Sequence, residues 1–407
     1  MAKVVFVAPF AMDSTLRFVR AAAQLPEIQL GLLSQEPFER VPGDLRKHLA
    51  AFHRIQNALD PDQLEQGVRK LAAELGGEVD RLIGILEQMQ EPMAEVRQRL
   101  GISGMDLKTA ANFRDKARMK DLFRKHGLPC AQHCLAENAK TARDFARKVG
   151  FPLVGKPPAG AGAQNTFRLE SGEELNQVLQ SMPPSPGKPM LLEEFMTGQE
   201  FSFDTVTVGG RHVLSSISQY FPSPLEVLET PWIQWCVILP REIEVPEFAD
   251  IFQVGRKALD AMGMQEGLTH MEWFRRPDGG LAISEVAARP PGAQFTSLLS
   301  YAHDFDFYQA WARLVSTGHF EIPERQFSAG AAYLRGQGGG RVQGLAGLQE
   351  AQKAMGDLVV EAKLPQEGQP KSSSYEGEGY VIVRHPETEV VKDALRQLIG
   401  MVQVEMH

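Results

Sequence analysis

The sequence predicts an α/β protein in which an N-terminal parallel sheet is followed by a larger antiparallel sheet. Strand-like and helix-like segments alternate up to about Gly104, as expected for a parallel sheet with crossover helices. Two later pairs of strand-like segments are joined by tight turns, at Gly209-Gly210 and at residues 277–280. The chain has 407 residues, which is more than one hydrophobic core usually covers, so we expect several packed domains.

The composition excludes several classes of partner. Apolar residues make up 43% of the chain and charged residues 23%, which is ordinary for a globular protein. The net charge of −8, with Lys and Arg spread along the chain, argues against a nucleic-acid partner. An anionic substrate must therefore be met by a local basic cluster. No apolar run is long enough for a membrane-spanning helix, so we expect no membrane partner.

The cysteines indicate a reducing compartment. Cys130, Cys134 and Cys236 give no even disulfide framework, which favours a cytoplasmic location. Cys130 and Cys134 have no Cys or His pair at zinc-site spacing, so we interpret them as structural.

The first domain begins with a strand buried on both faces. Residues 4–8 are continuously apolar, as in parallel sheets covered by helices on both sides. Asp13 or Ser14 is expected to cap the helix that follows. The loop between them lacks glycine, so the dinucleotide-binding fingerprint is absent. The expected strands are 4–8, 30–33 and 81–86, and helical spacing dominates residues 44–100, with helices at 14–24 and 60–75.

The next segment carries a lysine into a flexible loop. The strand expected at 153–156 ends in Lys156, and small residues including Gly160 and Gly162 follow. Backbone N–H groups of such a loop can surround a phosphate, while the lysine adds a positive charge. A plain hairpin fits the same pattern, and the loop is not a P-loop because no Gly-Lys-Ser/Thr follows.

The remaining elements are expected from periodicity and turn residues. The expected helices are 109–126, 141–149, 171–182, 247–262, 305–317, 345–355 and 387–401. The expected strands are 190–196, 201–208, 212–219, 330–334, 358–362 and 379–384, and residues 222–231 are expected to form an irregular loop.

The hairpin at 268–294 places two glutamates together. In an antiparallel ladder, Glu272 and Glu285 face each other on one side of the sheet. Paired carboxylates raise each other's pKa unless a cation lies between them, and Mg²⁺ is the usual cation that shares its ligands with phosphates. Arg289 follows as a permanent charge that can hold an anion in a bidentate fork. An exposed hairpin with ordinary surface charge is the alternative.

Taken in order, these features resemble the ATP-grasp superfamily over about residues 1–330. The matching features are Lys116 in Arg-Asp-Lys-Ala-Arg-Met-Lys, Lys156 before its loop, Glu193-Glu194-Phe195-Met196-x-Gly198-x-Glu200, and Glu272 with Glu285-x-x-x-Arg289. The resemblance implies an ATP-grasp fold with a pre-ATP-grasp domain at 1–108, a linker helix and lid at 109–196, a catalytic domain at 197–325, and a terminal α/β module at 326–407.

The resemblance also implies roles for individual residues. Lys116 and Lys156 would contact the phosphates of ATP, Lys156 taking part in catalysis, and Glu272 and Glu285 would hold Mg²⁺, with Mn²⁺ as the alternative metal. Glu200 would accept hydrogen bonds from the ribose hydroxyls. The adenine would lie against Glu193, Glu194, Phe195 and Met196, and the mobile lid would contain Gly160 and Gly162.

Within the superfamily, the chain resembles the bacilysin-type L-amino acid ligases. Glu285-x-Ala287-Ala288-Arg289 resembles their motif, although many superfamily members carry Asn where this chain has Ala287. His270 occupies a matching position before Glu272. The substrate residues implied are Glu229, which would meet an amino group, Trp232 in place of a histidine, His270, Arg289 and Gly292. Ordinary loop packing is the alternative for Trp232.

The implied activity is an ATP-dependent carboxylate–amine ligase that forms an amide, as in a dipeptide of L-amino acids, through an acyl phosphate. Arg289 would bind the carboxylate and take part in catalysis. Two alternatives remain: a ligase that activates bicarbonate, as biotin-carboxylase-like members do, and an ATP-binding regulator without catalysis. The sequence does not determine the oligomeric state, and a homodimer is the commonest choice among assemblies.

Overall fold

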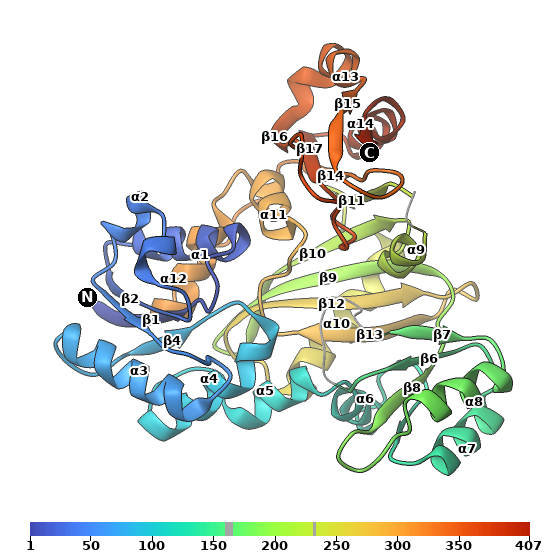
Figure 1. Ribbon diagram of the computed structural model, residues 1–407, viewed down its shortest axis with the longest axis horizontal. Coiled ribbons are helices and arrows are strands. Elements are labelled where there is room, and N and C mark those ends of the chain that lie inside the picture. The colour runs from blue at the N-terminus through green and yellow to red at the C-terminus, as the bar shows by residue number, and fades with distance from the viewer. Residues whose placement is uncertain (159–165, 231–232) are drawn as a thin grey trace.

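The computed structural model describes residues 1–158, 166–230 and 233–407, and their arrangement is shown in Figure 1. Gly160, Gly162 and Trp232 lie outside these residues. A four-stranded parallel sheet forms the N-terminal domain, in the order β3-β2-β1-β4. This confirms the expected parallel sheet. Its strands are β1 (Ala2–Val7), β2 (Ile28–Ser34), β3 (Ala51–Arg54) and β4 (Arg81–Ile83). Its helices are α1 (Asp13–Ala23), α2 (Gly43–Arg46), α3 (Pro61–Glu74) and α4 (Gln90–Leu100), with short 3-10 turns η1 (Phe38–Arg40) and η2 (Glu87–Met89).

Strand β1 is buried on both faces, as its sequence predicts. Val4 and Phe6 belong to one hydrophobic cluster, whereas Val5 and Val7 belong to another on the opposite face. The predicted cap of α1 is wrong, because the capping position is Met12, which makes no side-chain cap bond. Strand β3 was not predicted, since its sequence Ala-Phe-His-Arg has no apolar run.

The lid is a second four-stranded sheet, in the order β5-β8-β6-β7, with two helices on it. Its elements are β5 (His133–Ala136), α7 (Ala139–Val149), β6 (Leu153–Lys156), β7 (Phe167–Leu169), α8 (Gly172–Ser181) and β8 (Met190–Glu194). The single helix predicted at 109–126 is wrong, since two helices occur, α5 (Leu107–Arg114) and α6 (Lys116–Lys125). Asp115 breaks them apart because its side chain accepts hydrogen bonds from the N–H groups of Ala117 and Arg118, and so caps α6.

The central feature of the molecule is an eight-stranded antiparallel sheet, in the order β13-β12-β9-β10-β11-β14-β17-β16. The strands are β9 (Gln199–Val208), β10 (Arg211–Phe221), β11 (Trp235–Leu239), β12 (Gly267–Arg275), β13 (Leu281–Ala287), β14 (Ser328–Leu334), β16 (Val359–Lys363) and β17 (Gly379–His385). A separate ribbon pairs β15 (Val342–Ala346) with β18 (Gln403–Met406). The large antiparallel sheet that the sequence predicts is confirmed. The division into four domains stays a prediction, and this sheet continues across its last boundary at residue 326.

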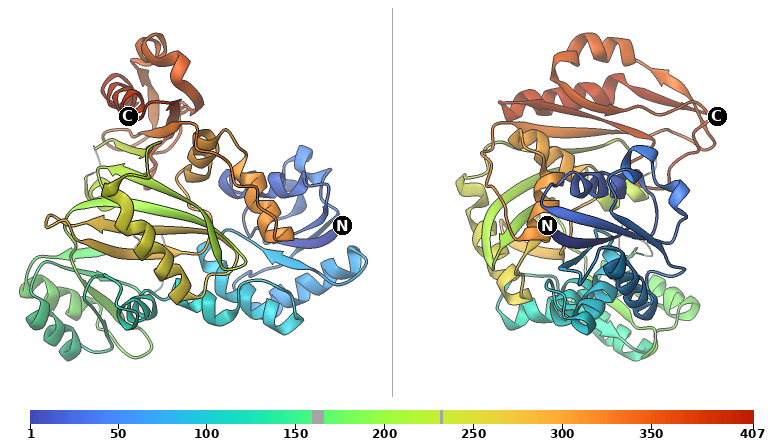
Figure 2. Two further views of the ribbon diagram at one scale, coloured as in Figure 1. Left: turned by 180° about the vertical axis from the view of Figure 1, so that it is seen from behind. Right: turned by 90° about the vertical axis from the view of Figure 1, so that its left-hand side faces the viewer.

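Helices cover both faces of the large sheet, as the two views of Figure 2 show. The helices in this part of the chain are α9 (Pro224–Glu229), α10 (Ala249–Met262), α11 (Phe295–His303), α12 (Phe307–Thr317), α13 (Leu348–Met355) and α14 (Thr388–Met401), with η3 (Pro246–Phe248) and η4 (Gly356–Leu358). The prediction that 222–231 is wholly irregular is wrong, because Ser223 caps the short helix α9 and Pro224 begins it. Helix α11 was not predicted, because it starts after two left-handed residues, Ala293 and Gln294.

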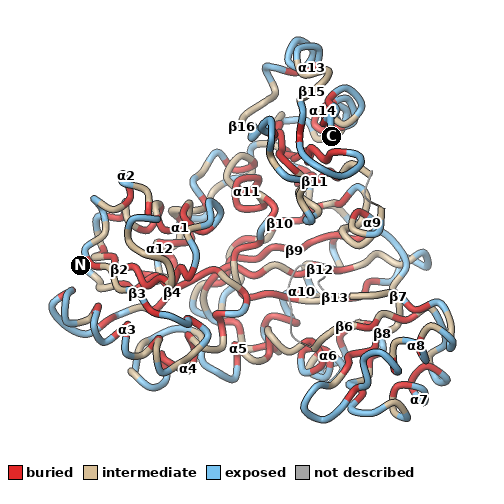
Figure 3. The backbone as a smooth tube through the Cα atoms, viewed as in Figure 1, coloured by how far each residue is buried: buried red, intermediate tan, exposed pale blue. Residues whose placement is uncertain are grey.

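The N-terminal domain and the large sheet share one hydrophobic core, so they pack as a unit. Trp311 of α12 contacts Phe18 of α1, with ring centroids 5.1 Å apart, and Phe6 of β1, at 6.2 Å. The cluster that contains these residues extends to Trp235 of β11. Figure 3 shows the buried backbone running through both sheets. Cys130, Cys134 and Cys236 are free. Within the described residues, no helix has the length and apolar character needed to cross a bilayer.

Candidate active site

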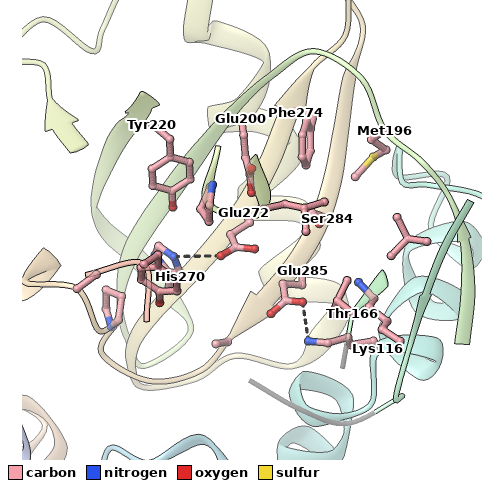
Figure 4. A pocket seen from close by; sticks show the side chains of 18 of the residues that line it. Lys116, Thr166, Met196, Glu200, Tyr220, His270, Glu272, Phe274, Ser284 and Glu285 are labelled. Carbon is pink, nitrogen blue, oxygen red and sulfur yellow. Dashed lines mark hydrogen bonds and ion pairs between the residues drawn. The ribbon is translucent and has the colours of Figure 1, made fainter. Parts of the chain in front are cut away.

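A cavity of about 210 Å³ lies where the lid meets the large sheet, and Figure 4 shows part of its lining. Every major part of the chain contributes to it: η2 from the N-terminal domain, α6, the lid strands, the large sheet and the C-terminal segment. Most of the residues singled out in the sequence meet here. They are Lys116, Lys156, Glu193, Glu194, Phe195, Met196, Glu200, His270, Glu272, Glu285, Arg289 and Gly292.

The other predicted site residues lie outside the cavity lining or outside the described residues. Glu229 is exposed at the end of α9 and does not belong to the described lining, to which this helix contributes Pro224 and Leu225 instead. The assignment of Glu229 to the substrate stays a prediction. Gly160, Gly162 and Trp232 fall outside the described residues, so their assignments stay predictions as well.

The two glutamates of the β12–β13 hairpin face each other. Glu272 and Glu285 are direct partners in the ladder, just before a register shift at Trp273. Nζ of Lys116 lies 2.5 Å from Oε2 of Glu285 (Figure 4). Burial raises the pKa of Glu285, but Lys116 and Lys156 outweigh it and hold this pKa at about 2. Burial and the charge of Glu285 raise the pKa of Glu272. Glu285 is therefore paired with a cation, and a cation bound beside Glu272 would stabilise the charged form of that carboxylate.

His270 lies between Glu272 and a second acidic residue. Its Nδ1 is 2.5 Å from Oδ1 of Asp204, the residue opposite it in the β9–β12 ladder, and its Nε2 is 3.8 Å from Oε1 of Glu272. Burial lowers the pKa of His270, but Asp204 raises it by more, so the net shift favours the imidazolium. Asp204 was not predicted from the sequence. The available signal was a carboxylate among the apolar and hydroxyl-bearing residues of 201–208.

A buried group of two lysines and one glutamate lies at the junction of α6 and the lid. Oε1 of Glu193 is 3.0 Å from Nζ of Lys120, and its Oε2 is 2.8 Å from Nζ of Lys156. Lys120 has no exposed surface and also donates to the carbonyl oxygen of Ser284. Burial raises the pKa of Glu193, but the two lysines outweigh it and hold it at about 2. Lys120 was not predicted as a site residue, although it stands one helical turn after Lys116.

The segment after β8 presents backbone groups to the cavity. The N–H of Glu194 donates to the carbonyl of Gln132, and the N–H of Phe195 donates to the carbonyl of Pro152. The N–H of Met196 has no backbone acceptor among the described residues, and Met196 lines the cavity, so this group can donate to a ligand. The guanidinium of Arg168 lies 4.2 Å from the centre of the Phe195 ring, which holds the ring in place.

Glu200 lies on β9 beside the paired glutamates. Glu200 is 8% exposed. Burial, together with the charges of Glu272 and Glu285, raises the pKa of the Glu200 carboxyl group well above its ordinary value. A neutral carboxyl group can both donate and accept a hydrogen bond, which suits a hydroxyl ligand.

Arg289 is oriented by the N-terminal domain. Its Nε lies 2.6 Å from Oε2 of Glu87, and its Nη1 donates to the carbonyl of Pro290 at 2.9 Å. The other carboxylate oxygen of Glu87 accepts from Nη1 of Arg114 at 3.0 Å. Glu87 was not predicted as a site residue, because it stands in a region of helical spacing with no motif around it.

The far end of the cavity is aromatic. In Figure 4, Tyr220 and His270 lie on the side of Glu272 away from Lys116. The aromatic residues that line the cavity on β10, β11, α11 and the C-terminal segment are Tyr220, Trp235, Phe295 and Tyr375. The cavity therefore has an end with lysines and paired carboxylates, suited to a phosphate-bearing ligand with a cation, and an end suited to an apolar group.

The fold belongs to a known class. The sequence profile of the ATP-grasp domain matches residues 121–300, which include most of the lid and the β9–β13 part of the large sheet. The crystal structure of an L-amino acid ligase from Bacillus licheniformis has the same fold, with a TM-score of 0.78 and 19% identity over 100% of this chain and 99% of that one. The chain has the ATP-grasp fold, as predicted.

Two sequence relatives show which kind of ATP-grasp enzyme this chain is similar to. The L-arginine-specific L-amino acid ligase of Bacillus subtilis is 23% identical over 323 residues, covering 74% of each chain. The alanine–anticapsin ligase of Bacillus subtilis strain 168 is 26% identical over 261 residues, covering 59% of this chain and 54% of that enzyme. The chain is thus similar to L-amino acid ligases, as its motifs predict.

Proposed function

We propose that this protein is an ATP-dependent ligase that joins the carboxylate of one L-amino acid to the amine of another, releasing ADP and phosphate. The observation that carries this proposal is the convergence of Lys116, Lys156, the Glu272–Glu285 pair and Arg289 on one cavity. The similarity of this chain to an enzyme named as an L-arginine-specific L-amino acid ligase and to the structure of an L-amino acid ligase supports the choice of amino acids as substrates.

Lys116 and Lys156 are proposed to hold the phosphates of ATP. Both lysines line the cavity. Nζ of Lys116 lies 2.5 Å from Oε2 of Glu285, and Nζ of Lys156 lies 2.8 Å from Oε2 of Glu193. The free N–H of Met196 suits the edge of an adenine ring, and Glu200 suits the ribose hydroxyls. The covering role predicted for Gly160 and Gly162 stays a prediction.

Glu272 and Glu285 are the residues that would hold Mg²⁺, or Mn²⁺ in its place. The fit is supported by their direct pairing and by the raised pKa of Glu272, which a cation would lower. No group of three or more His, Cys, Asp or Glu side chains converges as a metal site in the described part of the chain. Phosphate oxygens and water would therefore complete the shell, as Mg²⁺ commonly requires. When bound, the ion would neutralise charge on the phosphates.

Arg289 is proposed to act on the carboxylate substrate. A carboxylate oxygen attacks the γ-phosphorus of ATP, the bond to ADP breaks, and an acyl phosphate forms. The amine nitrogen then attacks the acyl carbon, loses a proton and expels phosphate, which leaves an amide. Arg289 can hold the carboxylate in the first step and the tetrahedral oxyanion in the second, since Glu87 fixes its orientation.

The paired glutamates provide the first prediction. Glu272→Gln and Glu285→Gln should each lower turnover about 10²–10³-fold, because each removes a charged metal ligand worth several kcal/mol to the transition state. The loss should be largest at low Mg²⁺ and be measured as phosphate release against Mg²⁺ concentration. Glu173→Gln on the exposed surface of α8 is the control. A Mg²⁺ dependence equal to that of the wild type would remove the pair from metal binding.

The activity itself is tested by phosphate release from Mg-ATP with pairs of the common L-amino acids. Release that requires particular pairs, with a product heavier than either amino acid, is expected. Release with bicarbonate alone would favour a bicarbonate-activating ligase. ATP binding without release on any substrate would favour a regulator. A cytoplasmic location and a homodimer remain predictions, which fractionation and light scattering would test.

A further inference from the structure

A loop from the C-terminal part of the chain reaches the aromatic end of the cavity. Tyr375 lines the cavity, and its ring packs edge-on against Trp235, with centroids 4.8 Å apart. Tyr375 lies well beyond residues 121–300, which the ATP-grasp profile matches. This wall of the cavity is therefore built by a segment outside the nucleotide-binding domain.

The fold fixes the position of this loop. The buried carboxylate of Glu378 accepts hydrogen bonds from the N–H of Ser372 at 2.8 Å and from the N–H of Gly336 at 2.7 Å. Gly377 has φ of 65°, and a Cβ there would lie 2.6 Å from the carbonyl oxygen of Leu334. Glycine is required at this turn. The turn and the hydrogen bonds of Glu378 together fix the backbone of the loop that carries the Tyr375 ring.

The neighbouring wall is rigid as well. Ala293 and Gln294 have φ of 49° and 60°, which are unfavourable for residues with a Cβ. Tyr333 donates its hydroxyl hydrogen to the carbonyl of Ala293, and Nη1 of Arg17 contacts Oε1 of Gln294 at 3.3 Å and Oγ of Ser297 at 2.9 Å. Strain of this kind persists only where the surroundings enforce it, so the pocket has a defined shape.

We propose that Tyr375 determines which side chain the carboxylate substrate can carry. This inference rests on the proposed ligase function, and it assigns the aromatic end of the cavity to that side chain. Arg289 holds the carboxylate beside the paired glutamates. The side chain then points toward the pocket bounded by the aromatic side chains of Tyr220, Trp235, Phe295 and Tyr375. His270 lies at the edge of this pocket, with its ring 5.1 Å from that of Phe295. The side chain accepted is apolar, and the Tyr375 ring limits its size.

The test compares Tyr375→Ala, Tyr375→Phe and the wild type. With the amine fixed, kcat/KM is measured for carboxylate substrates with alanine, valine, leucine, phenylalanine and tryptophan side chains. Tyr375→Ala should shift the ratio of large to small side chains about 10-fold or more, since one methylene in such a pocket is worth roughly 10–200-fold. Tyr375→Phe should keep the wild-type order, because the ring remains. The KM for ATP should change less than about twofold.

Several outcomes decide between this role and a structural one. Ser373→Ala, on the exposed side of the same loop, is the control and should match the wild type. Three results would overturn the inference. The first is an unchanged order of carboxylate substrates in Tyr375→Ala. The others are a rise in the KM for ATP as large as the change for the carboxylate substrates, and a change in amine preference in place of carboxylate preference. If Tyr375→Ala fails to fold, Tyr375→Leu replaces it, and the same ratios apply. Silence of the wild type on every pair would overturn the proposed function together with this inference.

Discussion

Replacing Arg289 with alanine is expected to lower turnover about 10²–10³-fold while nucleotide binding is retained, the effect of losing one preorganised oxyanion donor. Arg289 lies at the cavity but contacts no residue proposed for the adenine or ribose, since its described partners are Glu87 and Pro290. Turnover is measured as substrate-dependent phosphate release, and nucleotide binding by calorimetry with Mg-ADP. The KM for the carboxylate should rise and the Kd for nucleotide should stay within about twofold.

Two further variants make this result specific. Arg289→Lys keeps the charge but loses the bidentate fork, so its turnover should lie between those of the wild type and Arg289→Ala. Arg211→Ala, on an exposed hairpin of the large sheet, should leave both quantities unchanged. If Arg289→Ala kept wild-type turnover, the carboxylate and the oxyanion would have to be held by another group.

The part of the site that the sequence could predict depends on local geometry. The residues Pro277-Asp278-Gly279-Gly280 make a tight turn, and a turn fixes which residues face each other across the two strands. The register next to the turn would place Ser284 opposite Glu272, and a shift of one residue between Glu272 and Trp273 brings Glu285 there instead. The hairpin and the closeness of the two glutamates are therefore predictable from the sequence, whereas the register shift is not. In the same way, the apolar residues of β1 predict a strand covered on both faces.

The part that could not be predicted depends on contacts distant in the chain. Glu87 and Arg289 are 202 residues apart, and nothing near Glu87 marks it as the partner of an arginine. Lys120 becomes important only because α6 packs against the lid strand that carries Glu193. Tyr375 belongs to a turn between two strands that join the sheet from the C-terminal segment. Periodicity describes one element at a time, so it cannot report these pairings.

Removing the charge of Glu193 is expected to cost about 3–5 kcal/mol of folding free energy, as for one partner of a buried ion pair. Glu193→Gln keeps the shape but leaves Lys120, which has no exposed surface, without its carboxylate. Urea unfolding measures the loss. Glu194→Gln, on the next residue of the same strand, is the matched control, because its partner Arg276 is 3.4 Å away and both side chains are partly exposed. The control should cost about 1 kcal/mol or less.

The pH dependence of the free energy of unfolding tests whether the charge of Glu193 stabilises the folded protein. In the folded protein the pKa of Glu193 is about 2, below its ordinary value of 4.5. A lowered pKa means that the stabilisation is fully present above pH 4.5 and is lost as the pH falls toward 2. Glu193→Gln should lack this part of the dependence and approach the wild type at low pH. A constant difference between the two proteins across that range would show that packing, and not charge, is lost.

The role of Lys120 can be separated by adding Lys120→Met to Glu193→Gln. Burial lowers the pKa of Lys120 in spite of the charge of Glu193, so this lysine depends on the carboxylate to stay protonated. If the cost of Glu193→Gln comes from an unpaired buried ammonium group, the double variant should be more stable than Glu193→Gln alone. If the double variant is less stable, the bond from Lys120 to the Ser284 carbonyl carries the larger share, and the group serves mainly to fix β13, which bears Glu285, against α6.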